Sequence, residues 1–356
     1  AGLATMRILL RHSVRRRLLL AIALVLAVCT RAAGDNGPRG LDFYFIDVEG
    51  GAATLIVSPA GESILIDSGN PGERDAARIA AAAKDAGVSA IDYYITTHWH
   101  SDHMGGAAPL AKLMPIRQRF GHAIPDPLPE DINKDLMAAW NGLEGTPAFL
   151  EAGQTIKFKS RRGAADLRLK VVAANGLVDG EKPGAPQVTT CQDGVDARPE
   201  DTTDNARSLA MLLSFGRFDL FAGGDLTWNV EHKLTCPELK VPKVDVFIVD
   251  HHGVDLSNNP ALVKALDPEV AIVNSGPRKG AEPETMKLLL KQSGDVGVFQ
   301  IHRNVRDGAV NAEPARVANE EESCKGAYIH LKVDERGAHY TVEVPSRQTV
   351  REYDVR

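Results

Sequence analysis

Three histidines and an aspartate lie within six residues of one another in the stretch Thr96–Gly106, which reads TTHWHSDHMGG. His98 and His100 are two residues apart, so in an extended loop their side chains project to the same side. Asp102 and His103 can then turn towards a second, nearby point. Imidazole and carboxylate groups are the ligands expected for zinc and related divalent metals. The spacing therefore predicts a metal-binding loop.

Two later segments supply groups of the same kind. Asp225 follows two glycines at the end of an apolar run, and His251 and His252 follow the apolar segment Val244–Val249. Two metal ions held about 3.5–4 Å apart need a bridging carboxylate and another histidine in addition to the first loop. The set of residues thus predicts a dinuclear metal site.

The pattern H-x-H-x-D-H with Gly-Gly, followed downstream by Gly-Asp and His-His-Gly, resembles the metallo-β-lactamase-fold hydrolase superfamily. The stretches FIDVEGGAATLIVSPAGESILIDSG, FAGGD and VDHHG further resemble the branch that contains the hydrolase module of the DNA-uptake protein ComEC, over roughly residues 41–300. The resemblance implies an α/β fold of the αββα sandwich type. It also implies a set of metal ligands, namely His98, His100, Asp102, His103, Asp225 and His252, with His251 facing the substrate.

The same resemblance implies hydrolysis by a hydroxide that two divalent ions activate, with zinc expected and manganese as the alternative. Asp102 and Asp225 are the expected catalytic carboxylates, and Asp225 is expected to bridge the metals. His251 is expected to hydrogen-bond a transition-state oxygen or to act as a general acid. In this superfamily a bridging aspartate is typical of phosphodiesterases, lactonases and thioesterases.

We therefore predict an enzyme, a metal-dependent hydrolase of phosphoester or phosphodiester bonds. A lactone or β-lactam hydrolase is the first alternative, and a metal-binding module that has lost turnover is the second.

Two positions depart from the family pattern. A further histidine ligand often precedes the strand that begins here at Ser208, but this chain has Asp204 and Asn205 in that region. Asp204, Asn205 or water are the candidate replacements at the first metal. Where ComEC-like sequences tend to show His-Pro, this chain has Glu282-Pro283.

The elements that position these residues follow from the hydrophobic pattern and the turn residues. Strands are expected at 41–47, 53–57, 63–67, 91–96, 155–159, 167–173, 208–215, 218–222, 244–249, 270–274, 296–300, 327–333 and 339–344, and helices at 73–84, 259–266 and 282–292. The candidate ligands then lie on loops that leave strands, where layered α/β proteins often carry catalytic residues. Strands followed by helices occur twice, which predicts two facing halves. Asp67 ends one strand and is expected to orient a ligand histidine, with capping of a turn as the alternative.

Residues 1–33 differ in composition from the rest of the chain. Arginines precede an apolar run, Leu18–Val28, that is followed by small residues, and this predicts an export signal. The protein is then periplasmic or secreted, with a lipid anchor at Cys29 as the alternative. We further expect a linker at 34–40, the hydrolase domain at 41–345 with a loop-rich insertion at about 125–204, and a C-terminal tail at 346–356. After signal removal no transmembrane segment is expected.

The net charge of the chain bears on the class of substrate, and its cysteines bear on disulfide formation. Loss of the six arginines in residues 1–33 changes the formal net charge from −6 to −12. An acidic protein repels polyanions, which favours a small-molecule substrate over extended nucleic acid. The cysteines that remain are Cys191, Cys236 and Cys324. In an oxidising compartment one pair is expected to be bridged and one thiol left free, with the pairing open.

Overall fold

The computed structural model describes residues 39–184, 191, 195, 198–291 and 296–356. The export signal expected at 1–33 and most of the expected linker lie outside the described residues. Residues Arg39–Arg356 form one structural unit. Among the described residues, no helix combines the length and the apolar character that crossing a bilayer requires.

The first sheet begins as an antiparallel meander because tight turns separate short apolar segments. In the turn before Ser63, Gly61 has a φ of 81° and its N–H donates to the carbonyl of Ser58 at 2.8 Å. The strand order is β18-β17-β16-β1-β2-β3-β4-β5-β6, and β3, β4 and β5 run parallel. The strands are β1 (Leu41–Phe45), β2 (Thr54–Val57), β3 (Ser63–Ile66), β4 (Ile91–Ile95), β5 (Ile116–Gly121), β6 (Ala148–Phe149), β16 (Ile329–Val333), β17 (His339–Val344) and β18 (Thr349–Asp354).

The second sheet changes from antiparallel to parallel along its strand order, β15-β14-β13-β12-β11-β10-β8-β7, and β9 pairs with β8. From β11 to β15 each neighbouring pair is parallel. The strands are β7 (Thr155–Lys157), β8 (Leu167–Ala174), β9 (Leu177–Val178), β10 (Ala210–Phe215), β11 (Phe218–Ala222), β12 (Val246–Ile248), β13 (Val270–Val273), β14 (Gly297–His302) and β15 (Val317–Asn319). Every side chain of β12 and β13 is buried, as expected for parallel strands that are covered on both faces.

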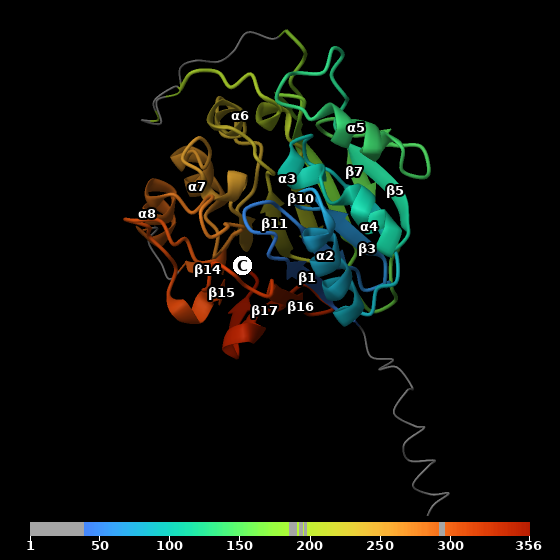
Figure 1. Cartoon of the computed structure of the whole chain (residues 1–356). Coiled ribbons are helices and arrows are strands. Elements are labelled where there is room, and N and C mark those ends of the chain that lie inside the picture. Colours follow the sequence, from blue (N-terminus) through green and yellow to red (C-terminus); the bar gives the residue numbers. More distant parts are fainter. Residues whose placement is uncertain (1–38, 185–190, 192–194, 196–197, 292–295) are drawn as a thin grey trace, which may run out of the picture. The chain divides into compact units, whose positions relative to one another are not determined.

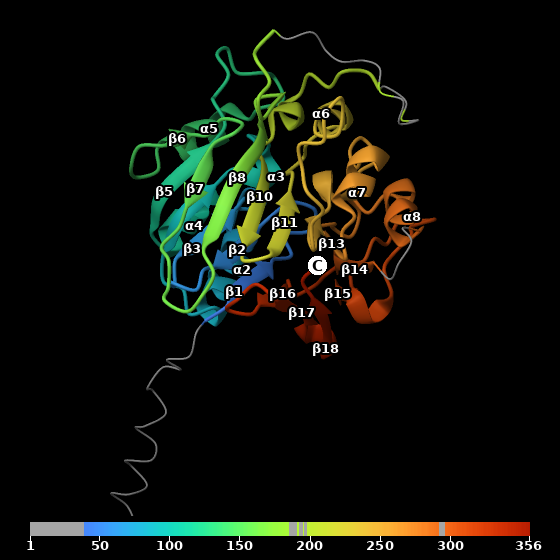
Figure 2. The same cartoon turned by 180° about the vertical axis from the view of Figure 1, so that it is seen from behind.

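Three apolar clusters define four layers. Phe43 of β1 and Phe218 of β11 belong to a core between the two sheets. A second core lies between the first sheet and α2 (Glu73–Asp85), α4 (Ala107–Leu113) and α5 (Lys134–Asn141). A third lies between the second sheet and α6 (Trp228–Lys233), α7 (Pro260–Leu266) and α8 (Pro283–Lys291). Figure 1 shows the two groups of helices on opposite sides, and Figure 2 shows β8, β10 and β11 side by side. The predicted αββα sandwich is confirmed.

The predicted strands and helices are all present, with ends within two residues of those expected. The helix α2 illustrates why: its buried residues Ala76, Ile79 and Ala83 recur at helical spacing and face the first sheet. The elements that the sequence did not predict are short or lie in polar segments, such as α3 (Ser101–Met104) and β6.

The expected C-terminal tail at 346–356 is wrong. Thr349–Asp354 forms β18, which pairs with β17 along its whole length at the edge of the first sheet. Most side chains of β18 are exposed, so the segment reads as polar, but backbone hydrogen bonds suffice to form an edge strand.

The expected insertion at about 125–204 is also wrong in part. Strand β8 lies inside this range, pairs with β10 and buries Leu167, Leu169 and Val171 in the core between the sheets. Strands β6 and β7 extend the two sheets from the same range. The sequence predicted strands at 155–159 and 167–173, but the abundant proline, glycine and charge of the surrounding loops concealed that these strands belong to the two sheets.

The structure decides the cysteine pairing. Cys191 and Cys236 form a disulfide with their Cα atoms 6.1 Å apart, and Cys324 is free. The two cysteines are 45 residues apart in the sequence, and the bridge ties Cys191 to the segment that follows α6.

We predict that Cys236→Ser lowers the free energy of unfolding by roughly 2–4 kcal/mol, because a bridge across a long segment restricts the unfolded chain. Urea unfolding of the variant and the wild type, both without reductant, measures the difference. Wild type treated with reductant should match the variant, and equal stability of oxidised wild type and variant would contradict the prediction.

Candidate metal centre

The carboxylate of Asp67 anchors the loop that carries the histidine motif. Asp67 directly follows β3 and is fully buried. Its Oδ1 accepts the N–H of Thr97 at 2.7 Å, and its Oδ2 accepts the Thr97 hydroxyl at 2.8 Å and His103 Nδ1 at 2.8 Å. Burial raises the pKa of Asp67, and the donors oppose this shift. Because Nδ1 of His103 is hydrogen-bonded to this carboxylate, its Nε2 is left to face the centre.

The tautomer of His98 follows from the same network. The Thr97 hydroxyl donates its one proton to Asp67, so at 3.2 Å from His98 Nδ1 it acts as an acceptor. Nδ1 of His98 therefore carries the hydrogen and Nε2 carries the lone pair. That Nε2 is buried and has no hydrogen-bond partner among the described residues. Burial also holds the pKa of His98 well below its ordinary value, so the ring is uncharged and its Nε2 can donate a lone pair to a metal.

His100 has the opposite arrangement of its ring nitrogens. Its Nε2 lies 2.9 Å from a carboxylate oxygen of Asp131, which leaves Nδ1 as the nitrogen available for a metal. The same oxygen of Asp131 accepts the N–H of Asp204 at 2.8 Å. The rings of His98 and His100 are 4.7 Å apart between centroids. A carboxylate on the outer nitrogen is the usual support of a ligand histidine.

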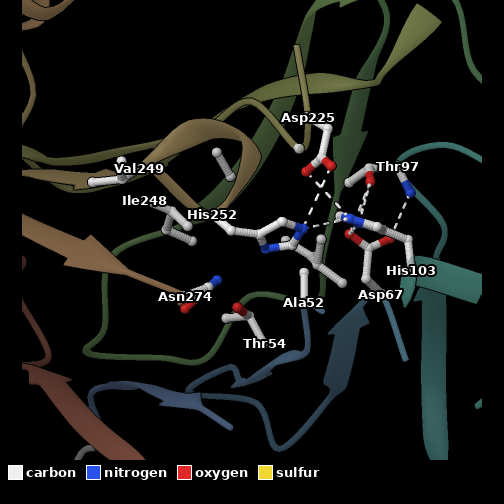
Figure 3. Close-up of a pocket in the computed structure, with 13 residues that line it drawn as sticks. Ala52, Thr54, Asp67, Thr97, His103, Asp225, Ile248, Val249, His252 and Asn274 are labelled. Atoms are coloured by element: carbon white, nitrogen blue, oxygen red, sulfur yellow. Dashed lines mark hydrogen bonds and ion pairs between the residues drawn. The ribbon is translucent and has the colours of Figure 1, made fainter. Parts of the chain in front are cut away.

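Four of the predicted ligands form a tight cluster. Asp102, His103, Asp225 and His252 each place one donor atom within 4.8 Å of all the others. His103 Nε2 lies 3.2 Å from Asp225 Oδ1 and 3.2 Å from His252 Nε2, and His252 Nε2 lies 3.2 Å from Asp102 Oδ2. Figure 3 shows the Asp225 carboxylate pointing at the rings of His103 and His252, with Asp67 beside His103. These donors come from three separate segments, which follow β4, β11 and β12.

Asp225 is the residue around which the remaining histidines gather. Its Oδ2 lies 3.8 Å from His98 Nε2, 3.5 Å from His251 Nε2 and 3.4 Å from His252 Nε2. With His103 on Oδ1, one buried carboxylate is surrounded by four imidazoles. This is the position that a bridging ligand requires.

The charges of the cluster are strongly coupled. Burial by itself raises the pKa of Asp225, but His103, His252 and His251 hold it well below its ordinary value. Burial lowers the pKa of His103, but Asp225, Asp67 and Asp102 hold it well above its ordinary value. Closely packed carboxylates thus require positive charge beside them. A donor set of imidazoles and carboxylates, with a bare buried nitrogen on His98, fits divalent metal ions.

The two consecutive histidines occupy unusual backbone conformations. His251 and His252 have φ of 52° and 56°, in the left-handed region that non-glycine residues rarely adopt. The turn is held by the carbonyl of His252, which accepts the N–H of Ala281 at 2.9 Å. A Cβ on Gly280 would lie 2.2 Å from that carbonyl oxygen, so only glycine fits there. Strain of this kind is typical of functional sites because it aims side chains that regular structure could not.

A lysine reaches the centre from the loop after β13. Lys279 Nζ donates to Asp102 Oδ2, and the Lys279 side chain is 44% exposed. Its neighbour Arg278 instead pairs with Glu322, with Nη2 3.0 Å from Oε2. Asp67, Thr97, His103, Asp225 and His252 also line a cavity of about 30 Å³, which has room for water or an ion. A substrate therefore has to bind on the exposed side, where Lys279 lies.

Part of the chain matches a known protein family. Residues 46–153 match the family model described as the metallo-beta-lactamase superfamily. The chain contains a metallo-beta-lactamase superfamily domain. The family predicted from the histidine motif is confirmed, and members of this superfamily are mostly metal-dependent hydrolases.

Two curated relatives match parts of the chain. Over 77 residues, 22% of this chain and 22% of the relative, it is 36% identical to thioesterase pkgB from Emericella nidulans. Over 241 residues, 65% of this chain and 24% of the relative, it is 24% identical to recombination protein 2 from Haemophilus influenzae. The matches span less than a quarter of each relative's length. The second match is compatible with the predicted ComEC-like branch.

Two solved structures of low identity are similar to parts of this chain. The metallo-beta-lactamase SMB-1, bound to 2-mercaptoethanesulfonate, is 14% identical, with 59% of this chain and 79% of that chain covered and a TM-score of 0.35. CmlA, a diiron beta-hydroxylase from Streptomyces venezuelae, is 13% identical, with 66% and 44% covered and a TM-score of 0.36.

The structure of this metallo-beta-lactamase domain distinguishes the candidates for the missing histidine. One oxygen of Asp204 accepts the N–H of Trp99 at 2.6 Å and lies 3.1 Å from His122 Nε2, so Asp204 supports the backbone of the histidine loop. Asn205 places Nδ2 3.4 Å from His251 Nε2. Asn205 Oδ1 and the second oxygen of Asp204 are both buried without a hydrogen-bond partner among the described residues. Of the two side chains, Asn205 is the one that contacts a residue next to Asp225.

Sequence reasoning did not identify three residues of the site. Asp131 on His100, Thr97 between Asp67 and His98, and Ser257, whose hydroxyl lies 3.1 Å from His251 Nδ1, were not predicted. Thr97 adjoins the motif and could have been inferred from its position. Asp131 and Ser257 lie in loops with no recognisable pattern, so the sequence carried no signal for them.

We predict that Asp67→Asn weakens metal binding by roughly 10–100-fold, because the amide is a poorer acceptor for His103 Nδ1–H than the carboxylate. Competition with a chromophoric chelator measures the affinity. Asp92→Asn is the matched control, since Asp92 on β4 hydrogen-bonds Ser63 and contacts no predicted ligand in the described contacts. Equal affinity in wild type and Asp67→Asn would exclude this supporting role.

Proposed function

We propose that this protein is a metal-dependent hydrolase that cleaves phosphoester or phosphodiester bonds in a small anionic substrate. The observation that carries the proposal is the pairing of Lys279 with Asp102 at the edge of the cluster centred on Asp225. A fixed cation beside two metal sites suits an anionic phosphoryl group, which carries charge in both the ground state and the transition state.

The proposed ligands divide between two metal positions. Asp102, His103, Asp225 and His252 are proposed to hold one ion, and their mutual distances support this. The other ion is proposed to bind His98 through Nε2 and His100 through Nδ1, with Asp225 shared. When bound, two such ions supply an activated hydroxide nucleophile and polarise the electrophile. Zinc suits this donor set, and manganese or iron are the alternatives.

The remaining residues act directly on the substrate or orient the ligands. His251 is buried, its Nδ1 is held by Ser257, and its Nε2 is turned towards Asp225 and Asn205. We assign to it a hydrogen bond to a developing oxyanion or to the leaving group. Lys279 binds a non-bridging oxygen of the substrate as a point charge.

The net charge supports a small substrate. A single lysine at the site offers one positive charge, whereas nucleic-acid binding draws on several basic side chains along the strand. The formal net charge of the whole chain is −6. Export to an oxidising compartment belongs to the same proposal, and the Cys191–Cys236 disulfide supports it.

A second candidate is hydrolysis of a thioester or lactone. The observation in its favour is the 36% identity, over 77 residues, to a protein named as a thioesterase. The same metal positions and His251 would serve an acyl carbonyl, but a neutral carbonyl makes no use of the Lys279 charge.

We predict that His103→Ala/Asp225→Ala loses two equivalents of divalent metal relative to wild type, because one proposed ion loses both ligands and the other loses the shared Asp225. Elemental analysis after zinc saturation and desalting measures the content. His339→Ala is the control, since His339 is an exposed histidine on β17 that pairs with Asp354. Equal metal content in the double variant and wild type would reject the proposed centre.

We predict that Lys279→Met lowers kcat/KM for bis-p-nitrophenyl phosphate by roughly 10–100-fold, which corresponds to the loss of one charge-assisted hydrogen bond. Rates with an uncharged lactone and an uncharged thioester should change little. Zinc and manganese are both tested at saturation and at fixed ionic strength.

The adjacent Arg278→Met is the matched control. This substitution also removes one positive charge, but Arg278 pairs with Glu322 and not with the metal centre. An equal loss in both variants would show a general charge effect instead of a contact with substrate. A wild-type rate that is highest for the thioester or the lactone would replace the phosphoester proposal by the second candidate.

A further inference from the structure

A second group of potential ligands lies outside the centre described above. Asp47 follows β1, His302 ends β14, and Cys324 lies in the loop between β15 and β16. One donor atom from each residue lies within 4.8 Å of the other two. Asp47 and His302 are fully buried, and Cys324 is partly buried. The group therefore joins the first sheet, the second sheet and one loop at a single point.

His302 has the ring arrangement of a metal ligand. Its Nδ1 lies 3.0 Å from the carbonyl oxygen of Arg303, which can only accept, so Nδ1 carries the hydrogen. Nε2 consequently carries the lone pair. It is buried, and it has no hydrogen-bond partner in the part of the chain that the structure describes. An unpaired imidazole nitrogen in the interior costs free energy that a bound cation would recover.

The thiol and the carboxylate face each other. Cys324 Sγ donates to Asp47 Oδ2 at 3.0 Å, while Asp47 Oδ1 accepts the N–H of Glu49 at 2.8 Å. Burial and the neighbouring carboxylate raise the pKa of Cys324 to about 11. The thiol thus keeps its proton at neutral pH unless a cation replaces it.

The charged side chains around this group have a net negative charge. Arg74 pairs with Glu49 and Asp75, and Arg78 pairs with Glu49 and Asp47. Two guanidinium groups against three carboxylates leave one negative charge. Ionisation of the thiol makes this two, which one divalent ion balances.

We propose that Asp47, His302 and Cys324 bind a single zinc-class ion, separate from the dinuclear centre. A thiolate, an imidazole and a carboxylate form a donor set that zinc accepts, and three protein ligands leave a fourth position for water. The ion crosslinks the two sheets. It also fixes the loop that begins at Asp47, which continues to Ala52, whose N–H donates to the carbonyl of Asp102 at 3.2 Å.

Cobalt substitution tests this site without reference to activity. The ligands proposed for the dinuclear centre contain no sulfur, and Cys191 and Cys236 are held in a disulfide. Cys29 is the remaining cysteine of the chain, so every protein in this test also carries Cys29→Ser. A thiolate-to-cobalt charge-transfer band in the unreduced protein then reports Cys324 alone. We expect the band in wild type and in His103→Ala/Asp225→Ala, its loss in Cys324→Ser, and its weakening in His302→Gln.

The metal count provides the second measurement. With zinc, wild type should hold one equivalent more than Cys324→Ser, and His103→Ala/Asp225→Ala should retain that one equivalent even if the dinuclear proposal fails. If Cys324→Ser does not fold, alkylation of Cys324 in wild type replaces it, and zinc should slow the reaction. Absence of the band at saturating cobalt, its persistence in Cys324→Ser, or alkylation unaffected by zinc would each overturn the site.

Discussion

The carboxylate of Asp225 is surrounded by imidazoles from the segments that follow β4 and β12. The arrangement of the candidate metal centre depends on this contact between the two segments. A buried carboxylate is costly unless positive charge lies beside it. His103 and His252 supply this charge when protonated, since their pKa values are raised by Asp225. Divalent ions supply it more effectively, because they bind several of these donors at once.

Buried carboxylates also hold the loops that bring these side chains together. Asp67 binds Thr97 and His103, and Asp204 binds the N–H of Trp99. On the other half, Glu231 of α6 accepts the N–H groups of Asn258 and Asn259, each at 2.8 Å, just after the two histidines. Burial and the neighbouring carboxylate of Glu231 raise the pKa of Asp250 well above its ordinary value, which disfavours two adjacent negative charges. Backbone N–H groups of irregular loops thereby find buried acceptors.

The two sheets contribute unequally to this arrangement. The first supplies Asp67 and the histidine loop, and the second supplies Asp225, His251 and His252 from the ends of parallel strands. Carboxyl ends of parallel strands collect loops at one edge, which is where α/β proteins commonly bind ligands. The contact of Leu209 N–H with the Thr97 carbonyl at 2.9 Å joins the halves close to the metal ligands. The group of Asp47, His302 and Cys324 joins them again at a second point.

The sequence by itself determined the parts that depend on near neighbours. The spacing within 98–103 indicated the metal-binding loop, and apolar periodicity located the principal strands and helices, because both are local properties of the chain. Polar edge strands such as β18 escaped, since backbone pairing needs no apolar pattern.

Only the tertiary structure decided which distant residues meet the ligands. Asp131 contacts His100 across 31 residues, Lys279 contacts Asp102 across 177, and Cys324 contacts Asp47 across 277. None of these side chains lies in a pattern that a single sequence reveals. Their partners are set by how the two sheets pack and by where irregular loops find buried acceptors, and both are properties of the folded chain as a whole.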